Sequence, residues 1–545
     1  MLQPRWKILT KEHDLPPVRG EKRREKIIDL LLKNRGLKIK SERETFLHPS
    51  LDQLPKHPSL LKGTLQSVHT RIEKAISSKE KIVIYGDYDV DGICSTGILW
   101  DFLYKKDAQV TPYIPHREGE GYGMNKETIT QFATDGVKLI LTCDQGINAK
   151  KEVEYAKSVG IDVIVTDHHA VPKILPDAFA IAHDSSLSGS GVAYLFAREF
   201  GSDENIDLAA LGTIADVLPL VGVNRVLAKF GLDELRKTKR PGLLALYDEA
   251  GIKPEIMTTY HISHVIAPRL NAMGRLEHAM ESLRLLMTND SDRAKRLAMV
   301  VGRTNLQRQN LMNEMYEQAR VEAVKFLEAP LQFIEGEAWP QGIIGLVAGK
   351  LVEEFYKPAI VLSMQENEVK GSARSIRGVN IVEVIGKCED LLIDYGGHPM
   401  AAGFSLERRS VTLFRERLVS LLTEQVGKEV YQKEITIDCE LTPQDVTLEL
   451  IRDVQELAPF GMGNPEPLFV GKAFRVGSVR LVGSDQTHLK LTVDGKDAIG
   501  FGLAREGNIP EVGEKIDLVF SLEKNEWNGN STAQLKLKDF KRSEE

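Results

Sequence analysis

Acidic residues and a pair of histidines follow short apolar runs at four widely separated places in this chain. The runs and the residues after them are IVIY before Gly86–Gly92 (GDYDVDG), LILTC before Asp144, VIVT before Asp167-His168-His169, and AALGTIA before Asp216. Carboxylates with one or two imidazoles suit Mn²⁺ or Mg²⁺, and there are enough of them here for two ions. Two ions about 3.5–4 Å apart can activate water and polarise a phosphate. The residue types therefore predict metal-dependent hydrolysis of a phosphoester.

Each of these residues also has an ordinary structural explanation. A carboxylate after a strand commonly caps the next helix, and an isolated His-His pair is more often structural or on the surface. The joint occurrence of GDYDVDG, Asp144, Asp167-His168-His169 and Asp216 instead favours a single site. Several carboxylates in one cleft would repel one another and some would be protonated, and divalent cations relieve that cost.

The elements that must position these residues alternate in type. Between about 80 and 220, short β-branched runs alternate with helical stretches, the first of them a helix over 93–103. This pattern predicts a parallel sheet covered on both faces. In open sheets of this kind, ligands bind beyond the carboxyl ends of the strands, so the first three acidic sites are expected to meet there. The stretch before Asp216 could be a strand or a helix.

The rest of the chain extends this unit into an α/β protein with two lobes and a β-rich end. A long polar stretch with helical spacing predicts a helix that connects the lobes, and short alternating strands near the end predict a small antiparallel barrel or sandwich. We expect five regions: a helical region at 1–60, a parallel-sheet domain at 61–278, a connecting helix at 279–328, a smaller α/β domain at 329–428 and the β-rich domain at 429–545.

Bulk composition narrows the class of protein. The chain has 545 residues, of which 42% are hydrophobic, and a net charge of −7, so any binding of nucleic acid must come from local basic patches or from metals. It has no apolar run of about 18 residues and no apolar signal core near its start, so neither a membrane span nor secretion is expected. The four cysteines show no CxxC spacing. This argues against a zinc-thiolate site and is typical of a protein in the reducing cytoplasm.

These motifs resemble the DHH phosphoesterase superfamily, and most closely the RecJ-type single-strand-specific 5′→3′ exonucleases. The first four motifs of the superfamily are represented in this chain by GDYDVDG (86–92), TCDQG (142–146), TDHH (166–169) and GTIADVLPL (212–220). The segment typical of RecJ is RLNAMGRL (269–276), and the second domain is represented by SARS (372–375) and GGHPMAAG (396–403). The stretch LAPFGMGNPEP (457–467) is similar to the start of the RecJ OB domain. The resemblance therefore implies an OB-like barrel and extends over nearly the whole chain.

The resemblance also implies a role for each motif residue. The implied metal ligands are Asp87, Asp89, Asp91, Asp144, His168 and Asp216, with Asp144 bridging two Mn²⁺ or Mg²⁺ ions. Other branches of the superfamily place a histidine near the position of Asp87. His169 would lie beside the scissile phosphate and act with Asp144 in catalysis, or would only form a supporting hydrogen bond. Asp167 would orient the neighbouring histidine.

An enzyme of this kind must also bind the phosphates of DNA. The residues implied to contact phosphate are Arg117, Arg275, Ser372, Arg374, Gly397 and His398. Arginine offers a planar fork for phosphate oxygens, and glycine allows close approach of the backbone. Gly342 and Gly345 could bind an anion or allow tight helix packing. Many relatives have a histidine where this chain has Pro340-Gln341, so no role of that histidine transfers.

The resemblance implies degradation of single-stranded DNA from its 5′ end to mononucleotides, in recombination and repair, by a protein that works with a helicase and a single-strand-binding protein. A monomer is expected because the two lobes already form the cleft. Phe460, Phe469 and Trp527 could stack on bases in the OB-like domain or pack in its core. Two alternatives are a nano-RNA or nucleotide phosphatase, or a cyclic-dinucleotide phosphodiesterase, of the same superfamily, and a non-catalytic scaffold that binds single strands. RLNAMGRL and the barrel argue against the first alternative, and the intact acidic positions argue against the second.

Overall fold

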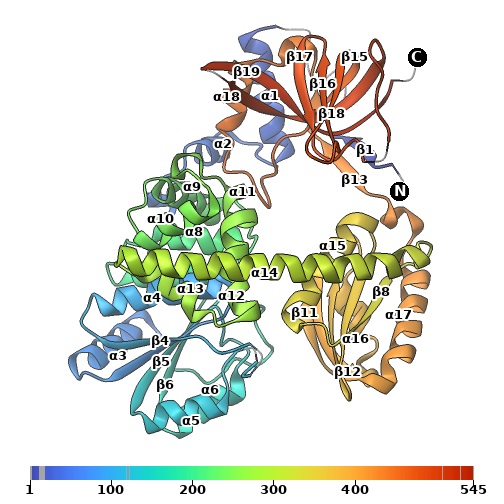
Figure 1. Cartoon of the computed structure of the whole chain (residues 1–545). Coiled ribbons are helices and arrows are strands. Elements are labelled where there is room, and N and C mark those ends of the chain that lie inside the picture. The colour runs from blue at the N-terminus through green and yellow to red at the C-terminus, as the bar shows by residue number, and fades with distance from the viewer. Residues whose placement is uncertain are drawn as a thin grey trace.

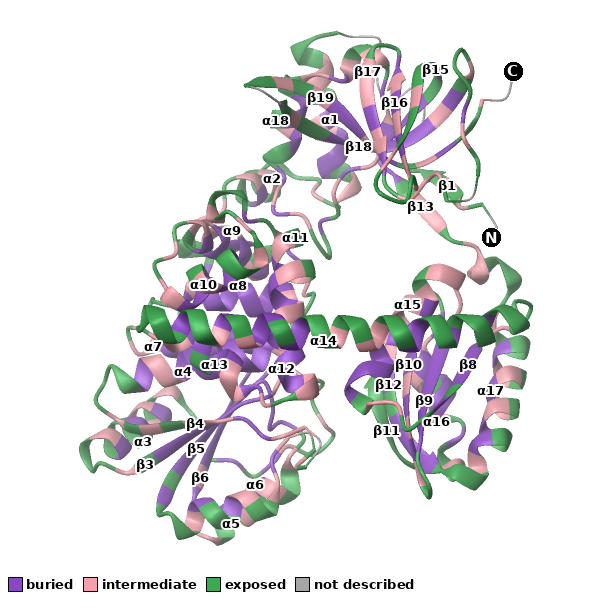
Figure 2. Cartoon of the chain, viewed as in Figure 1, coloured by how far each residue is buried: buried purple, intermediate pink, exposed green. Residues whose placement is uncertain are grey.

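Two α/β lobes are joined by one long helix, and a β-barrel lies beyond the first lobe (Figure 1). This computed structural model describes residues 3–10, 19–117, 119–121, 123–505, 507–527 and 529–543, apart from the side chain of Trp527. Buried residues fill the sheets, the barrel and the inner faces of the helices (Figure 2). No described helix is both long and apolar enough to cross a membrane.

The first lobe is built on a six-stranded sheet with the order β2-β7-β6-β5-β3-β4. Its strands are β2 (Leu60–Lys62), β3 (Lys81–Tyr85), β4 (Gln109–Tyr113), β5 (Val137–Cys143), β6 (Asp162–Asp167) and β7 (Ala180–His183). All pairings are parallel except that of the edge strand β2. Ile82 and Ile84 pack into the core on one face, whereas Val83 and Tyr85 pack into the core on the other. Burial on both faces explains why these strands are apolar throughout.

Helices cover both faces of this sheet, and further helices extend the first lobe toward the barrel. Those of the sheet region are α3 (Leu65–Ser77), α4 (Val90–Tyr104), α5 (Lys126–Thr134) and α6 (Lys150–Ser158). Those that follow are α7 (Gly189–Glu199), α8 (Ile206–Ala215), α9 (Gly222–Arg236), α10 (Pro241–Ala250), α11 (Thr259–His261), the π-helical turn Ile262–Ile266 and α12 (Ala267–Leu276). The stretch before Asp216 is therefore a helix.

The connecting helix α14 (Ser291–Ala323) has 33 residues and is thus about 50 Å long. It is shorter than the connecting helix expected at 279–328, because a separate helix, α13 (Met280–Met287), occupies the start of that range. A new helix starts after Asp290, whose carboxylate accepts hydrogen bonds from the backbone N–H groups of Asp292 and Arg293. This is a normal helix start.

The second lobe has a five-stranded sheet with the order β11-β12-β10-β9-β8. Its strands are β8 (Gln332–Glu337), β9 (Ala359–Met364), β10 (Glu368–Arg374), β11 (Leu392–His398) and β12 (Ala401–Glu407), and its helices are α15 (Gln341–Phe355), α16 (Ile381–Gly386) and α17 (Val411–Gln425). Only β8 and β9 pair in parallel. Gly342 of α15 touches α12 of the first lobe, because a Cβ there would lie 2.6 Å from the carbonyl oxygen of Arg275. The tight-packing interpretation of this glycine therefore holds.

The β-rich domain is a closed barrel and not a sandwich. Strands β15, β16, β17, β19 and β18 follow one another, and β18 pairs back with β15. The bounds in this domain are β14 (Cys439–Glu440), α18 (Leu448–Gln455), β15 (Phe469–Val482), β16 (His488–Val493), β17 (Lys496–Gly500), β18 (Lys515–Trp527) and β19 (Asn530–Arg542). Closure removes the exposed strand edges on which other chains could pair.

The N-terminal region packs on this barrel. Side chains of α1 (Glu21–Asn34) and α2 (Lys40–Leu47) share its apolar core, and β1 (Arg5–Ile8) pairs in parallel with β13 (Glu434–Ile437), just before the barrel. The expected helical region thus also contains a strand. The buried Arg225 joins these parts to the first lobe, because its guanidinium donates to the carbonyl oxygens of Phe46, Leu457 and Ala458.

Candidate active site

Three neighbouring parallel strands end at the same edge of the first sheet, and the acidic residues follow them. Asp87, Asp89 and Asp91 come after β3, Asp144 follows β5, and Asp167 is the last residue of β6. Their convergence follows from the parallel pairing of β3 with β5 and of β5 with β6. Asp216 reaches the same place from the C-terminal end of α8.

The side chains form three overlapping groups of potential metal ligands. In each group the ligand atoms lie within 4.8 Å of one another, and the groups are Asp87-Asp89-Asp144, Asp91-His168-Asp216 and Asp144-His168-His169. Asp144 and His168 each belong to two groups, so they join the three into one centre. The structure thus brings together every metal ligand that the sequence predicts.

The carboxylates of this centre are held without enough donors to balance their charge. Burial, followed by neighbouring carboxylates, raises the pKa of Asp87 and Asp144 well above the usual range. The same causes raise the pKa of Asp216 to about 8. One oxygen of Asp87 and one of Asp144 are buried and accept no hydrogen bond from the described residues. Asp216 also lies at the negative end of a helix, where a cation is favoured. This donor set fits divalent cations such as Mn²⁺ or Mg²⁺.

Backbone N–H groups hold two of the carboxylates in place. Asp91 accepts hydrogen bonds from the N–H groups of Gly189 (2.6 Å) and Ser190 (2.9 Å) at the start of α7. Asp89 caps α4 by accepting from Gly92, so the helix-cap explanation is correct for this residue, which is also in a ligand group. A Cβ on Gly189 would lie 2.7 Å from Oδ1 of Asp144. Sequence reasoning missed this glycine, although the SGSG run at 188–191 was a visible signal.

The two histidines face different partners. Nε2 of His168 lies 3.0 Å from Oδ1 of Asp144, 3.7 Å from Oδ2 of Asp216 and 3.9 Å from Oδ2 of Asp91. Burial lowers the pKa of His168, which favours the neutral imidazole that metals bind. Nδ1 of His169 instead lies 2.8 Å from Oδ1 of Asp167. Although burial opposes it, this hydrogen bond raises the pKa of His169 to about 9.

Asp167 is the residue that orients this loop. Its carboxylate accepts hydrogen bonds from the backbone N–H groups of Ile147 (2.9 Å), His168 (2.7 Å) and His169 (3.1 Å), and from the His169 ring. Although burial opposes it, the bonds from His169 lower the pKa of Asp167. Its four contacts are to the protein, and it is in none of the three ligand groups.

We therefore expect Asp167→Asn to lower activity about 10- to 100-fold, the usual effect of losing an outer partner of a metal site. The amide can accept fewer of these hydrogen bonds, and its NH₂ group would face backbone donors. The measurement is kcat/KM on a nucleic-acid substrate, together with the melting temperature with and without Mn²⁺. Asp135→Asn, at an exposed aspartate of the same lobe at the end of α5, is the control. Equal activity of Asp167→Asn and the wild type would contradict the orienting role.

Predicted phosphate-binding residues gather where the two lobes meet. Arg275 donates to the carbonyl oxygen of Gly342, and Arg374 donates to the hydroxyl of Ser372. Burial, followed by the charges of Arg117, Arg374 and Arg308, lowers the pKa of Arg275 to about 10. Burial and Arg117 also lower that of Arg374. The positive charges of these arginines act on one another, so they form a positive cluster, to which α14 adds Arg308, a residue that the sequence did not suggest.

Gly397 and His398 of the second lobe lie at the end of the strand β11 and not in a turn. Gly397 has a φ of 144°, and a Cβ there would lie 2.3 Å from the carbonyl oxygen of Ala401, so only glycine fits. His398 ends β11 and is exposed, and no contact between it and the arginines is seen among the described residues. A Cβ on Gly345 would lie 2.9 Å from both Arg374 and Ser372. The absence of a side chain at Gly345 therefore lets Arg374 and Ser372 pack directly against the start of α15.

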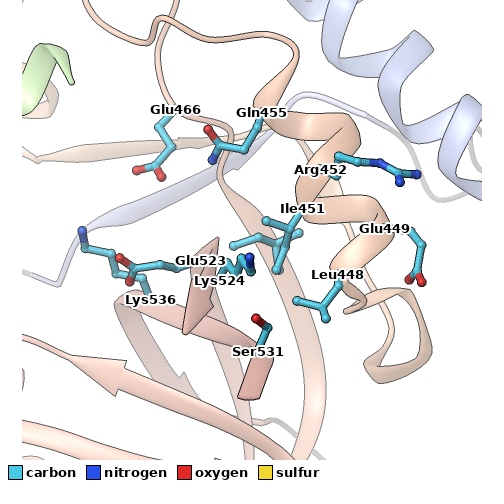
Figure 3. A pocket seen from close by; sticks show the side chains of 11 residues that line it. Leu448, Glu449, Ile451, Arg452, Gln455, Glu466, Glu523, Lys524, Ser531 and Lys536 are labelled. Carbon is cyan, nitrogen blue, oxygen red and sulfur yellow. The ribbon is translucent and has the colours of Figure 1, made fainter. Parts of the chain in front are cut away.

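Two of the three aromatic residues that the sequence singles out in this domain pack in its core. Phe469 is fully buried and Phe460 packs on the barrel core, whereas the side chain of Trp527 lies outside the described part of the chain. Phe501 is the more exposed aromatic residue, at 59%. A cavity of about 740 Å³ between α18 and the β18–β19 hairpin has both acidic and basic side chains (Figure 3), with Glu449, Glu466 and Glu523 against Arg452, Lys524 and Lys536. This balance gives no net charge to attract a phosphate backbone.

Comparison with known proteins gives consistent matches along the chain. Residues 81–217 match the DHH family N-terminal domain, residues 323–426 the DHHA1 domain and residues 437–539 the RecJ OB domain. The single-stranded-DNA-specific exonuclease RecJ of Bacillus subtilis is 38% identical, over 99% of this chain and 70% of that protein. The Escherichia coli protein of that name is 33% identical, over 84% of this chain and 86% of that protein. The crystal structure of RecJ with Mn²⁺ from Thermus thermophilus has a TM-score of 0.84 at 29% identity, over 99% of this chain and 80% of that one.

The fold and the site together define a metal-binding phosphoesterase of the DHH type. The chain belongs to the RecJ family of single-stranded-DNA-specific exonucleases. The resemblance seen in the sequence and the expected fold class, with two lobes, a long helix and an OB barrel, are thereby confirmed. Structures of family members with Mn²⁺ and with Mg²⁺ agree with the donor set of this chain.

Proposed function

We propose that this protein hydrolyses single-stranded DNA stepwise from the 5′ end and releases mononucleotides, in DNA recombination and repair. The observation that carries the proposal is the pairing of a buried carboxylate-histidine centre with a cluster of arginines at the junction of the two lobes. The first part suits two divalent cations and the second suits phosphate groups. A DNA strand could then place one phosphate at the metal centre and a neighbouring phosphate at the arginine cluster.

The proposed metal ligands are Asp87, Asp89, Asp91, Asp144, His168 and Asp216. Bound Mn²⁺ or Mg²⁺ would supply Lewis acidity and would lower the pKa of water for attack on phosphorus. Asp144 supports this proposal best, because it belongs to two ligand groups and its buried Oδ1 lies 3.0 Å from Nε2 of His168, another proposed ligand. Asp91 would keep its orientation through the N–H groups of α7.

His169 would act on the substrate and not primarily on the metal. Its Nδ1 is held by Asp167, so we propose that a contact with the phosphate is made through Nε2. A protonated ring there would donate a hydrogen bond to a nonbridging oxygen or a proton to the leaving oxygen. Asp167 would favour the form of the ring that carries a proton on Nδ1.

The arginine cluster would bind the 5′-phosphate and so set the direction of digestion. Arg374 lies beside Ser372, and both pack against Gly345 at the start of α15, and Arg275 and Arg117 add to the positive charge. Gly397 and His398 would contribute from the end of β11. Charged hydrogen bonds of this kind are worth about 1.5–3 kcal/mol each.

Arg374→Ala is therefore expected to raise KM for 5′-phosphorylated strands about 10- to 100-fold, with a much smaller change for strands that end in a 5′-hydroxyl. Steady-state digestion of matched oligonucleotides with the two 5′ ends measures this. Arg377→Ala, an exposed arginine three residues later, is the control. Equal losses on both kinds of end would contradict a 5′-phosphate pocket at Arg374.

The test of the function itself is release of nucleotides with Mn²⁺ or Mg²⁺ from oligonucleotides labelled at either end. We expect mononucleotides from the 5′ end of single strands and little release from blunt duplexes. Preference for dinucleotides over long strands would favour a nucleotide phosphatase or a cyclic-dinucleotide phosphodiesterase of the same superfamily. Binding of strands without any cleavage would favour a non-catalytic scaffold.

We further propose that the protein acts as a monomer in the cytoplasm, with a helicase and a single-strand-binding protein as partners. An enzyme that needs unpaired strands depends on another protein to separate the duplex. One chain already brings the metal centre and the arginine cluster together across the lobe junction, which supports a monomer. The four buried, unpaired cysteines are consistent with a reducing compartment.

A further inference from the structure

An exposed stacked pair of rings lies on the first lobe, outside the site described above. Tyr260 is 62% exposed, and its ring is stacked on that of His264, with centroids 4.5 Å apart and planes 16° apart. His264 is exposed as well. The two residues flank the start of the π-helical turn Ile262–Ile266, and such turns are rare and often occur at functional sites.

The pair lies on the same continuous helical rod as Arg275. The rod comprises α11, the π-helical turn and α12, and it runs from Thr259 to Leu276. The 15 residues from Tyr260 to Arg275 correspond to about 22 Å at the rise of an α-helix. Along the accessible side, Pro268 and Arg269 lie partly exposed between them. One end of the rod is thus in the arginine cluster.

The other end of the rod contacts the segment that leads into the barrel. The Thr259 hydroxyl donates a hydrogen bond of 2.6 Å to the carbonyl oxygen of Phe460, and α11 lies at the edge of the first lobe that faces the barrel (Figure 1). The aromatic pair therefore lies between the phosphate-binding cluster and the barrel, where a strand longer than a few nucleotides would pass.

Stacked rings four residues apart also occur where they only stabilise a helix. Trp100 and Tyr104 of α4 show this, with centroids 5.0 Å apart, planes 21° apart and Tyr104 59% exposed. That pair lies at the C-terminal end of α4, whereas the metal ligands lie at its N-terminal end. The two pairs have the same chemistry in different places, so a comparison of them isolates the effect of position.

We propose that the Tyr260–His264 pair is a base-stacking platform that holds the DNA strand between the arginine cluster and the barrel. This proposal rests on the proposed function, because it takes single-stranded DNA as the ligand. Every base has an aromatic face, so such a platform binds strands without regard to sequence. At 3.4 Å per nucleotide, about 22 Å corresponds to at most about seven nucleotides from the 5′ end.

The first test compares Tyr260→Ala with Tyr104→Ala on substrates of different length. We expect Tyr260→Ala to raise KM about tenfold on long single strands, with kcat unchanged and with no effect on 5′-phosphorylated dinucleotides, which are too short to reach the pair. Tyr260→Phe should behave as the wild type. If Tyr260→Ala matches Tyr104→Ala on long strands, or weakens both substrates equally, the proposal is overturned.

The second test locates the contact without catalysis. A fluorescent base analogue, 2-aminopurine, is placed at successive positions of a strand bound to the inactive Asp144→Asn form. Quenching is expected at one window of positions, at most about seven nucleotides from the 5′ end, and it should be lost with Tyr260→Ala. An unchanged profile would overturn the platform. Failure of the proposed function would look different, because the wild type itself would then release no nucleotides from any strand.

Discussion

Asp144→Asn is expected to lower kcat/KM on single-stranded DNA about a thousandfold or more. Its carboxylate belongs to two of the three ligand groups, so an amide there would weaken every metal position that these groups share. Loss of several kcal/mol of metal-derived stabilisation corresponds to a factor of this size. Strand binding through the arginine cluster should remain, and a fluorescence binding assay would measure it.

The same substitution should change stability in opposite directions with and without metal. Added Mn²⁺ should raise the melting temperature of the wild type by binding the folded state, and Asp144→Asn should lose most of that rise. Without metal, the variant should be the more stable form at neutral pH, because it lacks a buried carboxyl whose pKa is raised. A carboxyl with a raised pKa destabilises the fold only above its unfolded pKa, so this advantage should fade below about pH 4.

Asp135→Asn is the matched control. Asp135 precedes β5 and Asp144 follows it, so the same change of charge occurs at the opposite end of one strand. Its activity and its metal-dependent melting temperature should equal those of the wild type. If Asp144→Asn also kept both properties, Asp144 would not be a ligand of the metal centre.

His169→Ala is expected to lower kcat about 10²- to 10⁴-fold, the range for a side chain that transfers or donates a proton. Its ring is oriented by Asp167 at 2.8 Å, whereas His168 approaches three carboxylates. The two neighbouring histidines should therefore differ in kind. His168→Ala should abolish most of the Mn²⁺-dependent rise in melting temperature, and His169→Ala should keep it.

Two results would contradict this division of roles. A loss of the metal effect in His169→Ala would make His169 a ligand, as its membership of one ligand group allows. A change in kcat of less than about tenfold would leave it only a supporting hydrogen bond. Parallel measurements on both variants, with strand binding as a check on folding, separate these outcomes.

Much of the site could be predicted because it follows from local rules. The short β-branched run at 82–85, in a pattern where such runs alternate with helices, predicts a strand buried on both faces, which the structure has, and parallel strands bring their carboxyl ends together. Those two rules place Asp87, Asp144 and Asp167 at one edge before any coordinates are known. The motif resemblance added the family, and RLNAMGRL with the barrel separated it from shorter relatives.

Other features depend on contacts that no local pattern records. The N–H groups of Gly189 and Ser190 orient Asp91 from almost one hundred residues away, and Arg308 enters the arginine cluster only because α14 crosses the lobe junction. The expected connecting helix was longer than α14, because Asp290 can cap a helix as well as continue a polar stretch. The sequence also left open whether Asp216 follows a strand or a helix, since a short apolar run suits both.

The sequence by itself determined the chemistry of this protein, because the residue types and their spacing after strands define which ions and which reaction suit the site. Only the tertiary structure decided which distant residues meet. Asp144 and His168 join three ligand groups into one centre, and α1 and α2 complete the core of a barrel formed more than four hundred residues later. It also decided that Tyr260 and His264 lie between the arginine cluster and the barrel. The reason is physical: strand and helix patterns are local, whereas the meeting of distant surfaces depends on how whole elements pack.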